Sequence, residues 1–500
     1  MRPFTATIIL IVFLHVKPTR SAKTIHWCAD LTVLAFALRQ VLSVLIGEPQ
    51  PFLASACTFV ISMFVGFSYP KASVFALAVL CLPCNALLQM GIGTSSLSPS
   101  FLFSSLAMGW IAAGHCRRKG LSRHAGGQPT YRHLPGIIAA ISTIWIFISC
   151  GVQVSEHWDS IEWRVLVQTP LFGFGHEYYF VTASFILISG LEIFRRIFLL
   201  QASRIVMVIP IWGLAICLFC FLQYTLNIPE PLWGVGFFLP LEDISSFGSF
   251  LAVTFTYLCW SLTLPHRWTF ATRTIIGTLL SALSVCAVLS FSRATWLTIT
   301  LSAIALAFYH LSRRGVLILT FALLCALGMF QLRGISYLLE SNAYLSRFSA
   351  LVRIEDVLSK DGGRTHLYFK AARMIAERPL TGHGVGSFYR SSMRYRGGGV
   401  SDPYKDQPEF AHNSLLQLTA ELGIPAAALS LLLILCACQP VLQQRGGHCS
   451  IALFAALWAY ITTQMTANSL NVYITNQIAF SVLLGALSVN ARYATPNRQS

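Results

Sequence analysis

Residues 272–311 read TRTIIGTLLSALSVCAVLSFSRATWLTITLSAIALAFYHL. Two largely apolar runs, 272–291 and 294–311, stand on either side of Ser292 and Arg293, and the other charged residue in the stretch is Arg273. The apolar residues form continuous runs and do not alternate with polar ones, which favours helices over strands. Runs of about 18 residues with so few charges are long enough to cross a bilayer as helices. The stretch therefore predicts two consecutive membrane-spanning helices joined by a short turn.

The same composition extends through the whole chain. Hydrophobic residues make up 55% of its 500 residues and charged residues 11%, whereas soluble domains carry about 25% charged residues. Within hydrocarbon the backbone must satisfy its own hydrogen bonds, so continuous apolar runs become helices. We therefore expect an all-α fold, a polytopic membrane bundle of about 12–14 transmembrane helices with one large, partly helical periplasmic loop.

Apolar runs of helical length recur on both sides of residues 272–311. We interpret as spans the residues at about 28–47, 52–68, 72–91, 101–115, 134–153, 178–198, 204–225, 246–264, 272–291, 294–311, 315–332, 413–437, 450–467 and 474–490. Residues 4–16 are short for a span and predict either an interfacial helix or a signal-like start.

Basic residues give the expected topology an orientation. The chain has a net charge of +16. If the spans alternate from a cytoplasmic N-terminus, almost every short basic loop falls on the cytoplasmic side, as the positive-inside rule requires. The expected parts are N-terminal spans (1–240), core spans with the Ser-Arg pair (241–332), the periplasmic loop (333–411) and C-terminal spans (412–500). We therefore expect a multi-pass membrane protein whose long loop lies on the outer side of the membrane.

The periplasmic loop at 333–411 contains 12 Lys or Arg and 8 Asp or Glu residues. Its basic balance favours an anionic partner, although a merely solvated domain would show the same excess. Within it, residues 364–377 have helical spacing, with Leu367, Ala371 and Met374 on one side. Asp361-Gly362-Gly363 precedes this helix and Pro379 ends it.

Neither the cysteines nor the glycine-rich turn predicts a cofactor. Cys81-x-x-Cys84 and Cys217-x-x-Cys220 have metal-like spacing, but each lies in an expected span without a second ligand pair. The sequence GHGVG at 382–386 lacks the Lys-Ser/Thr of a P-loop and the strand that precedes a dinucleotide site. It predicts a tight turn. We expect no metal, no cofactor and no nucleic-acid partner.

Two arginines are candidates for binding phosphate. Arg293 begins a span at the expected outer rim, where it either anchors the helix end or grips phosphate oxygens with its planar guanidinium group. Arg364 opens the loop helix, and Tyr368 one turn later is placed to shield or orient it. At another outer rim, Asp243 follows Glu242, and this pair either binds a sugar hydroxyl or caps the next helix.

The start of the helix at 413–437 carries the remaining candidates. His412 is either an ordinary polar residue at a helix start or a general base, since the usual histidine pKa of about 6.5 suits proton transfer near neutral pH. Asn413 is expected to be the N-cap. Gln417 and Glu421 follow at one-turn intervals, and an acid within a span is a functional candidate. Because Glu421 is out of phase with His412, we expect it to tie helices together.

Several short motifs keep a fixed order around the periplasmic loop. They are Ser292-Arg293, Arg364 with Tyr368, PLTGHGVGSF at 379–388, and HNSLLQ at 412–417 followed by ELG at 421–423. Together they resemble the O-antigen ligase and polymerase family, which includes lipopolysaccharide O-antigen ligases, polysaccharide polymerases and bacterial O-oligosaccharyltransferases. The resemblance covers about residues 240–437.

The resemblance implies a metal-independent, inverting glycosyltransferase at the outer face of the inner membrane. The implied donor is a glycan on undecaprenyl pyrophosphate, with Arg293 and Arg364 as pyrophosphate binders and His412 as the catalytic histidine. Asp243, Tyr368, Asn413, Gln417 and Glu421 complete the candidate substrate-binding set. The acceptor would be lipid A–core or another glycan or lipid-linked molecule.

Two other functions are compatible with much of the same sequence. A polymerase would use a second lipid-linked repeat unit as the acceptor. A non-enzymatic polysaccharide exporter or flippase would instead spread charges along a central path through many spans. The expected spans contain few charged residues, Arg39, Glu192 and Glu421 among them, and the polar candidates gather at one outer rim. This distribution favours an enzyme.

Overall fold

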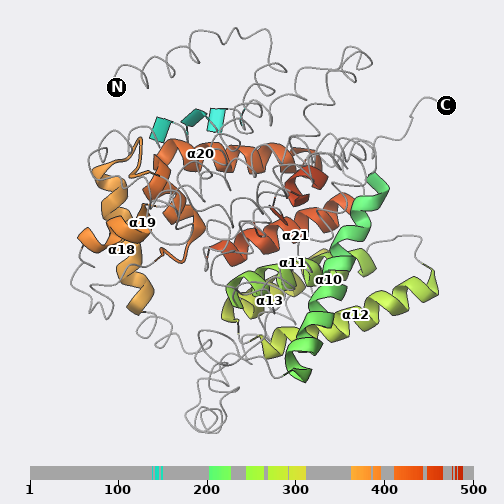
Figure 1. The fold of residues 1–500 in the computed structure, drawn as a ribbon. Coiled ribbons are helices and arrows are strands. Elements are labelled where there is room, and N and C mark those ends of the chain that lie inside the picture. The colour runs from blue at the N-terminus through green and yellow to red at the C-terminus, as the bar shows by residue number, and fades with distance from the viewer. Residues whose placement is uncertain are drawn as a thin grey trace, which may run out of the picture.

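Figure 1 shows the computed structural model of the protein. The structure describes residues 138, 141–142, 144–145, 148–149, 202–226, 244–263, 269–290, 292–310, 362–384, 387–395, 410–442, 448–465, 476, 479–480 and 482–487. The expected spans before residue 134, those at 178–198 and 315–332, the segment 4–16, and Asp243 lie outside the described residues.

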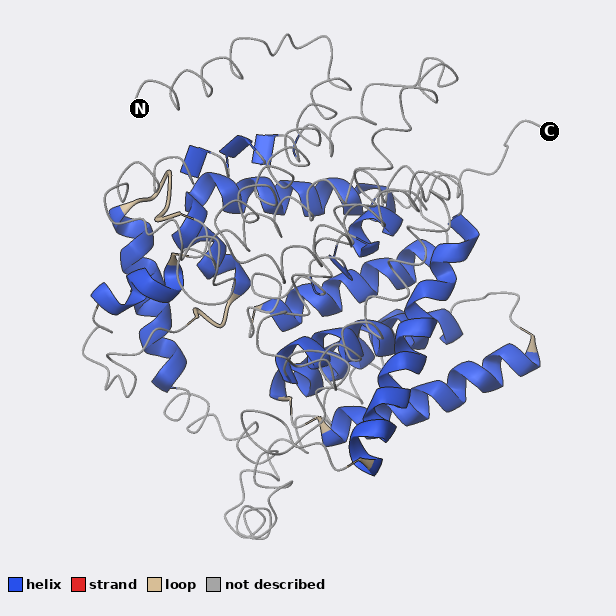
Figure 2. Cartoon of the chain, viewed as in Figure 1, coloured by secondary structure: helices blue, strands red, loops and turns tan. Residues whose placement is uncertain are grey.

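The described part of the chain is helical, with turns and no strand (Figure 2). Its helices are α10 (Ala202–Thr225), α11 (Ile244–Thr263), α12 (Phe270–Leu289), α13 (Arg293–His310), α18 (Gly362–Glu377), α19 (Phe388–Ser391), the 3-10 helix η5 (Ser392–Arg394), α20 (Ser414–Leu442) and α21 (His448–Gln464). The all-α prediction is confirmed for these residues. The helices expected at 204–225, 246–264, 272–291, 294–311 and 450–467 are present to within a few residues.

Three of these helices are long and apolar enough to cross a membrane, over Val208–Thr225, Phe270–Leu289 and Ser414–Gln439. Shorter apolar helices occur at Ser246–Leu262, Ala294–Leu306 and Ser450–Gln464. Large apolar side chains are exposed on the outside of the bundle, including Leu218, Phe221 and Val288. Exposed apolar side chains of this size are suited to contact with lipid.

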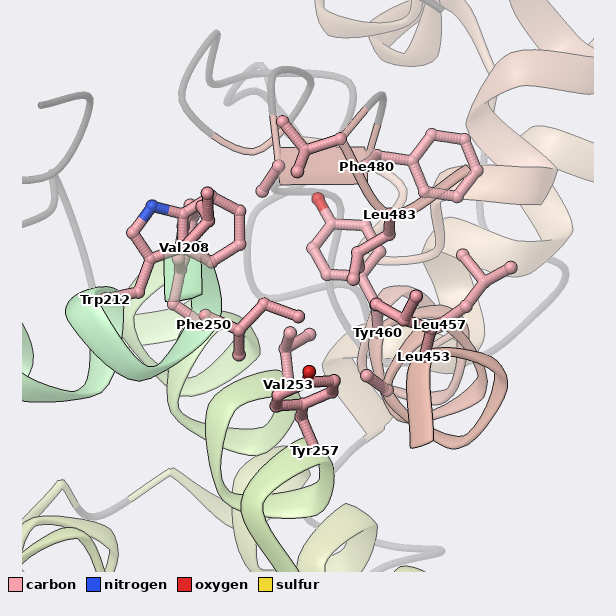
Figure 3. Close-up of a cluster of buried hydrophobic side chains, with 14 of the residues drawn as sticks. Val208, Trp212, Phe250, Val253, Tyr257, Leu453, Leu457, Tyr460, Phe480 and Leu483 are labelled. Atoms are coloured by element: carbon pink, nitrogen blue, oxygen red, sulfur yellow. The ribbon is translucent and has the colours of Figure 1, made fainter. Parts of the chain in front are cut away.

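Helix α11 lies at the centre of the helical bundle and packs against α10, α12, α13 and α21. The core formed there contains large side chains, several of which Figure 3 shows. Trp212 of α10 meets Phe250 of α11 edge to face at 5.3 Å, and Tyr460 of α21 stacks on Phe480 at 5.6 Å. Buried aromatic pairs of this kind fix the relative positions of the helices they join.

A second cluster of buried residues lies where α18 and α19 pack against α20, at one side of the bundle in Figure 1. It consists of Ala371, Met374, Phe388, Ala411 and Ala420. The predicted apolar side of α18 is confirmed, because Leu367, Ala371 and Met374 are all buried. The helix begins at Gly362, so the two glycines belong to its first turn.

Helix α20 differs from the uninterrupted span expected at 413–437, because it is kinked at Gly423, where φ is 82° and ψ is 170°. Before the kink, Leu416 and Ala420 pack in the cluster around α18. After it, Leu433 and Ala437 belong to the core of the bundle. The kink therefore divides α20 into a part that receives the loop and a part that joins the bundle.

Candidate active site

His412 lies between the end of the loop and the start of α20. Its φ is 48°, a left-handed conformation that is uncommon for a residue other than glycine. The side chain is half-buried. Residues held in such conformations concentrate at functional sites, where the surrounding structure must hold them in place.

Asn413 caps α20, which confirms its predicted place in the helix. Its Oδ1 accepts the backbone N–H groups of Leu415 at 3.1 Å and Leu416 at 3.0 Å. Its Nδ2 donates to the carbonyl of Met465, just beyond α21, at 3.1 Å. The cap therefore attaches the start of α20 to the end of α21, and it fixes the chain next to His412 from one side.

Gln417 and Glu421 form a buried pair on the first part of α20. The Gln417 Nε2 donates to Glu421 Oε1 at 3.0 Å, and the Gln417 Oε1 accepts the backbone N–H of Ala411 at 3.3 Å. Glu421 is thus connected through Gln417 to the peptide that precedes His412. The Glu421 backbone carbonyl accepts from Gly384 N at 2.8 Å, which ties this part of α20 to the turn before α19.

The turn at residues 379–384 docks on the kink of α20. It includes the first part of the tight turn predicted at 382–386, of which residues 385 and 386 lie outside the described residues. His383 N donates to the Ala420 carbonyl at 3.1 Å, and Ile424 N donates to the Pro379 carbonyl at 2.8 Å. The backbone carbonyl of Leu422 accepts from the indole N–H of Trp145 at 2.8 Å. The backbone groups released by the kink are therefore bonded from outside the helix.

Two glycines allow the turn and the kink to approach so closely. A Cβ at Gly382, where φ is 65°, would lie 2.3 Å from the Glu421 carbonyl oxygen. A Cβ at Gly423 would lie 1.9 Å from the Leu380 carbonyl oxygen. Both distances are far below contact, so any side chain at either position would separate the two segments.

His383 is a structural residue of this turn, and this role was not predicted from its sequence context. Its Nε2 lies 3.1 Å from the Met374 carbonyl, and its ring meets Tyr395 edge to face at 6.0 Å. Burial lowers the pKa of His383, so the neutral ring is favoured.

The ring of Tyr395 links η5 to the end of α18, because its hydroxyl donates a hydrogen bond to the Glu377 carboxylate. Burial and this bond raise the pKa of Tyr395 to about 12. The same bond lowers the pKa of Glu377. The tyrosine is therefore protonated and the glutamate ionised at neutral pH.

Arg364 and Tyr368 lie one turn apart on α18, and both are half-buried. Arg364 is about two turns before Ala371 and about three turns before Met374, the residues that pack near α20. The same helix buries His366 and Lys370 completely, and neither was among the predicted residues. Their basic character was visible in the sequence, but their burial was not, because it depends on how the loop folds.

Arg293 is the first residue of α13. Ser292 immediately before it caps this helix, with its Oγ 3.4 Å from Thr295 N. A Cβ at Gly248 of α11 would lie 2.1 Å from Thr295 Oγ1 and 2.7 Å from Ser292 Oγ. The start of α13 therefore lies directly against the first turns of α11.

A chain of side-chain hydrogen bonds joins the same turns of α11 to the start of α20. Gln464 at the end of α21 donates from Nε2 to Ser249 Oγ at 3.0 Å. Its Oε1 accepts the hydroxyl of Ser414 at 3.1 Å. Because Ser249 is next to Gly248, the backbones of Arg293 and His412 lie at the same end of the bundle. Sequence reasoning did not find this connection.

The second Cys-x-x-Cys pair, Cys217 and Cys220, lies on α10, and Cys286 of α12 is a further cysteine of the bundle. Cys217, Cys220 and Cys286 are free thiols. Within the residues that the structure describes, no group of three His, Cys, Asp or Glu side chains is arranged to hold a metal ion. Cys81 and Cys84 lie outside the described residues.

The described residues form a helical protein with three helices long enough to cross a membrane. Its candidate site lies where the loop helix α18 packs against the kinked apolar helix α20. A family model described as O-antigen ligase matches residues 276–431, which include Arg293, Arg364 and His412. This part of the chain is therefore similar to the O-antigen ligase family, and the resemblance inferred from the motifs is confirmed for these residues. Comparison with curated proteins finds no match for the chain.

The family supports a general class of activity. Its members are membrane proteins associated with glycosyl transfer of the O-antigen ligase or polymerase type, with lipid-linked glycans as substrates. The match begins within α12 and ends in the second part of α20, so α11 and α21 lie outside it.

Proposed function

We propose that the protein is a metal-independent, inverting glycosyltransferase of the bacterial inner membrane. It transfers a glycan from undecaprenyl pyrophosphate to an acceptor hydroxyl on the periplasmic face. The observation that carries this proposal is the position of Arg293 and His412 at one end of the bundle, within the region that matches the O-antigen ligase family. A single active site needs both the donor-binding and the proton-accepting groups at one membrane surface.

The proposed reaction is a direct displacement at the anomeric carbon. His412 accepts the proton of the acceptor hydroxyl as the oxygen attacks. The bond from the anomeric carbon to the pyrophosphate oxygen breaks, and the leaving undecaprenyl pyrophosphate takes the electron pair. Arg293 and Arg364 stabilise the negative charge that grows on this leaving group, and they act most strongly where water is partly excluded.

The remaining candidates surround this reaction. Asn413 and Gln417 fix the backbone on both sides of His412, through bonds to Leu416 and Ala411. Glu421 orients Gln417 from its other side. Tyr368 and Asp243 are proposed contacts of the donor or the acceptor sugar.

The proposed membrane arrangement has about 12–14 spans, with the loop at 333–411 in the periplasm. The exposed apolar side chains of α10 and α12 and the three helices of membrane-spanning length support it. The domain limits at 240, 332 and 411 belong to the same proposal. A reporter that is active only in the periplasm should be active when it is inserted at residues 397–399, and a reporter that is active only in the cytoplasm should be inactive there. The reverse result would invert the proposed topology.

A reconstituted transfer assay tests the proposed chemistry. The purified protein in liposomes receives an undecaprenyl-pyrophosphate-linked oligosaccharide together with lipid A–core. We expect His412→Ala and Arg293→Ala each to lower kcat by at least about 100-fold, within the range of single catalytic groups. Arg273→Ala is the matched control, because Arg273 is an exposed arginine in the first turn of α12. Its variant should transfer glycan at the wild-type rate.

The same assay separates the alternatives. Transfer of a whole glycan to lipid A–core supports a ligase, whereas a ladder of lipid-linked products without lipid A–core supports a polymerase. If both variants transfer glycan as fast as the wild-type protein, the assigned roles are wrong. If the wild-type protein moves the lipid-linked glycan across the bilayer and forms no new glycosidic bond, the exporter reading replaces the enzyme.

A further inference from the structure

Helix α21 ends in a buried glutamine that connects two parts of the proposed active site. Gln464 is 3% exposed, and its partners Ser249 and Ser414 are 0% and 5% exposed. Since α11 and α21 both lie outside the matched residues 276–431, the family match does not include this connection. We propose that Gln464 is a positioning residue that holds residues 411–417, and with them His412, in place against α11 and the start of α13.

The chemistry of this position is specific to an amide. Gln464 uses its carbonyl oxygen to accept the Ser414 hydroxyl at 3.1 Å and its amino group to donate to Ser249 Oγ at 3.0 Å. An amide side chain offers one acceptor and one donor group from a single planar unit. An apolar residue of similar size would leave two buried hydroxyl groups without this partner.

A second contact from the same turn strengthens the attachment. The Met465 carbonyl, one residue after Gln464, accepts from Asn413 Nδ2 at 3.1 Å. Asn413 and Ser414, the two residues that follow His412, are therefore both bonded to the end of α21. At the other end of this part of α20, the Glu421 carbonyl is held by Gly384 N at 2.8 Å. The first part of α20 is thus fixed at both of its ends.

The attachment reaches the start of α13 through α11. Ser249 adjoins Gly248, and Ser292 and Thr295 lie so close to Gly248 that a Cβ there would overlap them. Moving Gln464 would shift the start of α20 relative to this contact. A shift of about 1 Å between reacting groups can lower a rate about 100-fold, even when the altered residue does not touch the substrate.

This inference rests on the proposed function, and two variants test it. We expect Gln464→Leu to lower kcat by about 10- to 100-fold with a smaller change in KM for the lipid-linked donor. Tyr460→Phe is the matched control on the same helix, one turn earlier. It removes a buried hydroxyl bonded to the Asn476 carbonyl at 3.0 Å and Asn476 Oδ1 at 3.2 Å. It should lower the melting temperature as Gln464→Leu does, yet leave kcat within about twofold of wild type.

A conservative variant adds a pH readout. In Gln464→Glu both serine hydroxyls still have an acceptor, but a buried carboxylate is unfavourable and a buried acid tends to stay protonated to higher pH. The protonated acid resembles the amide in shape and again supplies a donor. The ratio of variant kcat to wild-type kcat should therefore rise severalfold as the pH is lowered from about 8 to about 6.

Hydrogen exchange tests the positioning role without relying on catalysis. Backbone N–H groups in residues 411–417 should exchange faster in Gln464→Leu than in wild type, and at the wild-type rate in Tyr460→Phe. Unchanged exchange in Gln464→Leu, or a kcat equal to that of Tyr460→Phe while His412→Ala is inactive, would overturn the inference and leave the proposed function standing. Faster exchange in a protein that transfers no glycan would instead count against the proposed function alone.

Discussion

The bundle core and the loop-docking region are held together by different means. In the core, large side chains such as Trp212, Phe250 and Tyr460 are almost completely buried between helices. In the docking region, alanines fill much of the buried cluster, and two glycines bring backbone against backbone. The core therefore draws its stability from buried apolar area, whereas the docking region draws its geometry from the close approach of two backbones and the hydrogen bonds between them.

The bundle core therefore mainly determines the stability of the fold, whereas the docking region mainly determines the position of the proposed active-site residues. A core of large side chains mainly resists unfolding. A contact between two backbones, such as the one at Gly382 and Gly423, allows almost no shift. His412, the proposed base, directly precedes the part of α20 that is held in the second way, and Glu421 lies within that part. Substitutions in the two regions should therefore have different consequences.

The largest effect is expected in the core. Trp212→Ala removes a side chain that is 0% exposed, and such a change typically costs about 3–5 kcal/mol of unfolding free energy. Leu214→Ala on the same helix is the control, because Leu214 is 62% exposed and should change the stability little. Denaturant unfolding in detergent micelles measures both. Equal stability of the two variants would show that the packing seen around Trp212 does not support the fold.

A smaller but more local effect is expected at the kink. Gly423→Ala would place a Cβ 1.9 Å from the Leu380 carbonyl oxygen and force a side chain into a left-handed backbone conformation, which alone costs about 1–2 kcal/mol. We expect the turn at residues 379–384 to separate from α20 while the core remains folded. Limited proteolysis should then cut within residues 379–395, and transfer activity should fall sharply.

Another glycine provides the control for this prediction. Gly277 of α12 has nothing within 4 Å of an added Cβ. Gly277→Ala should therefore stabilise its helix, by about 0.5–1 kcal/mol, and leave the loop resistant to protease. If Gly423→Ala is as protease-resistant and as active as Gly277→Ala, the tight contact between the turn and the kink does not exist in the membrane.

Local sequence signals accounted for much of the fold. Continuous apolar runs located α10 to α13 and α21 to within a few residues, because membrane-length helices depend mainly on composition and length. The capping role of Asn413 was also predictable, since a cap bonds to backbone groups two and three residues away. The apolar side of α18 followed from its period. Each of these features is decided within a few turns of one helix.

The features that were missed depend on distant contacts. Gly423 lies within the run expected as one span at 413–437, and the kink there is held in place by a turn about forty residues earlier. Gln464 and Ser249 are 215 residues apart in sequence. The burial of His366 and Lys370 likewise depends on how the loop packs. Spacing along one helix carries no information about such pairs.

The smallest effect concerns the pH dependence of the docking region. Burial lowers the pKa of His383 in the folded loop, and this effect exceeds the opposing one of its hydrogen bond to the Met374 carbonyl. The charges of Arg378 and Arg394 lower the pKa further, and that of Glu377 raises it. In the undocked loop the histidine pKa returns to about 6.5. The undocked state therefore binds the proton more readily, and docking loses stability as the pH falls below about 6.5. The lowered pKa of Glu377 acts in the same direction at more acidic pH.

Hydrogen exchange at residues 379–395, corrected for its intrinsic pH dependence, measures this loss. We expect less protection at about pH 5.5 than at about pH 7.5 in the wild-type protein. His383→Gln keeps a donor for the Met374 carbonyl but does not titrate, so its protection should change less over the same interval. The core around Trp212 should be indifferent to this change in pH, because its large buried side chains do not titrate there. Equal losses of protection in the core and the loop would mean that the two regions unfold as one unit. The core would then not determine stability separately from the docking region that positions the active site.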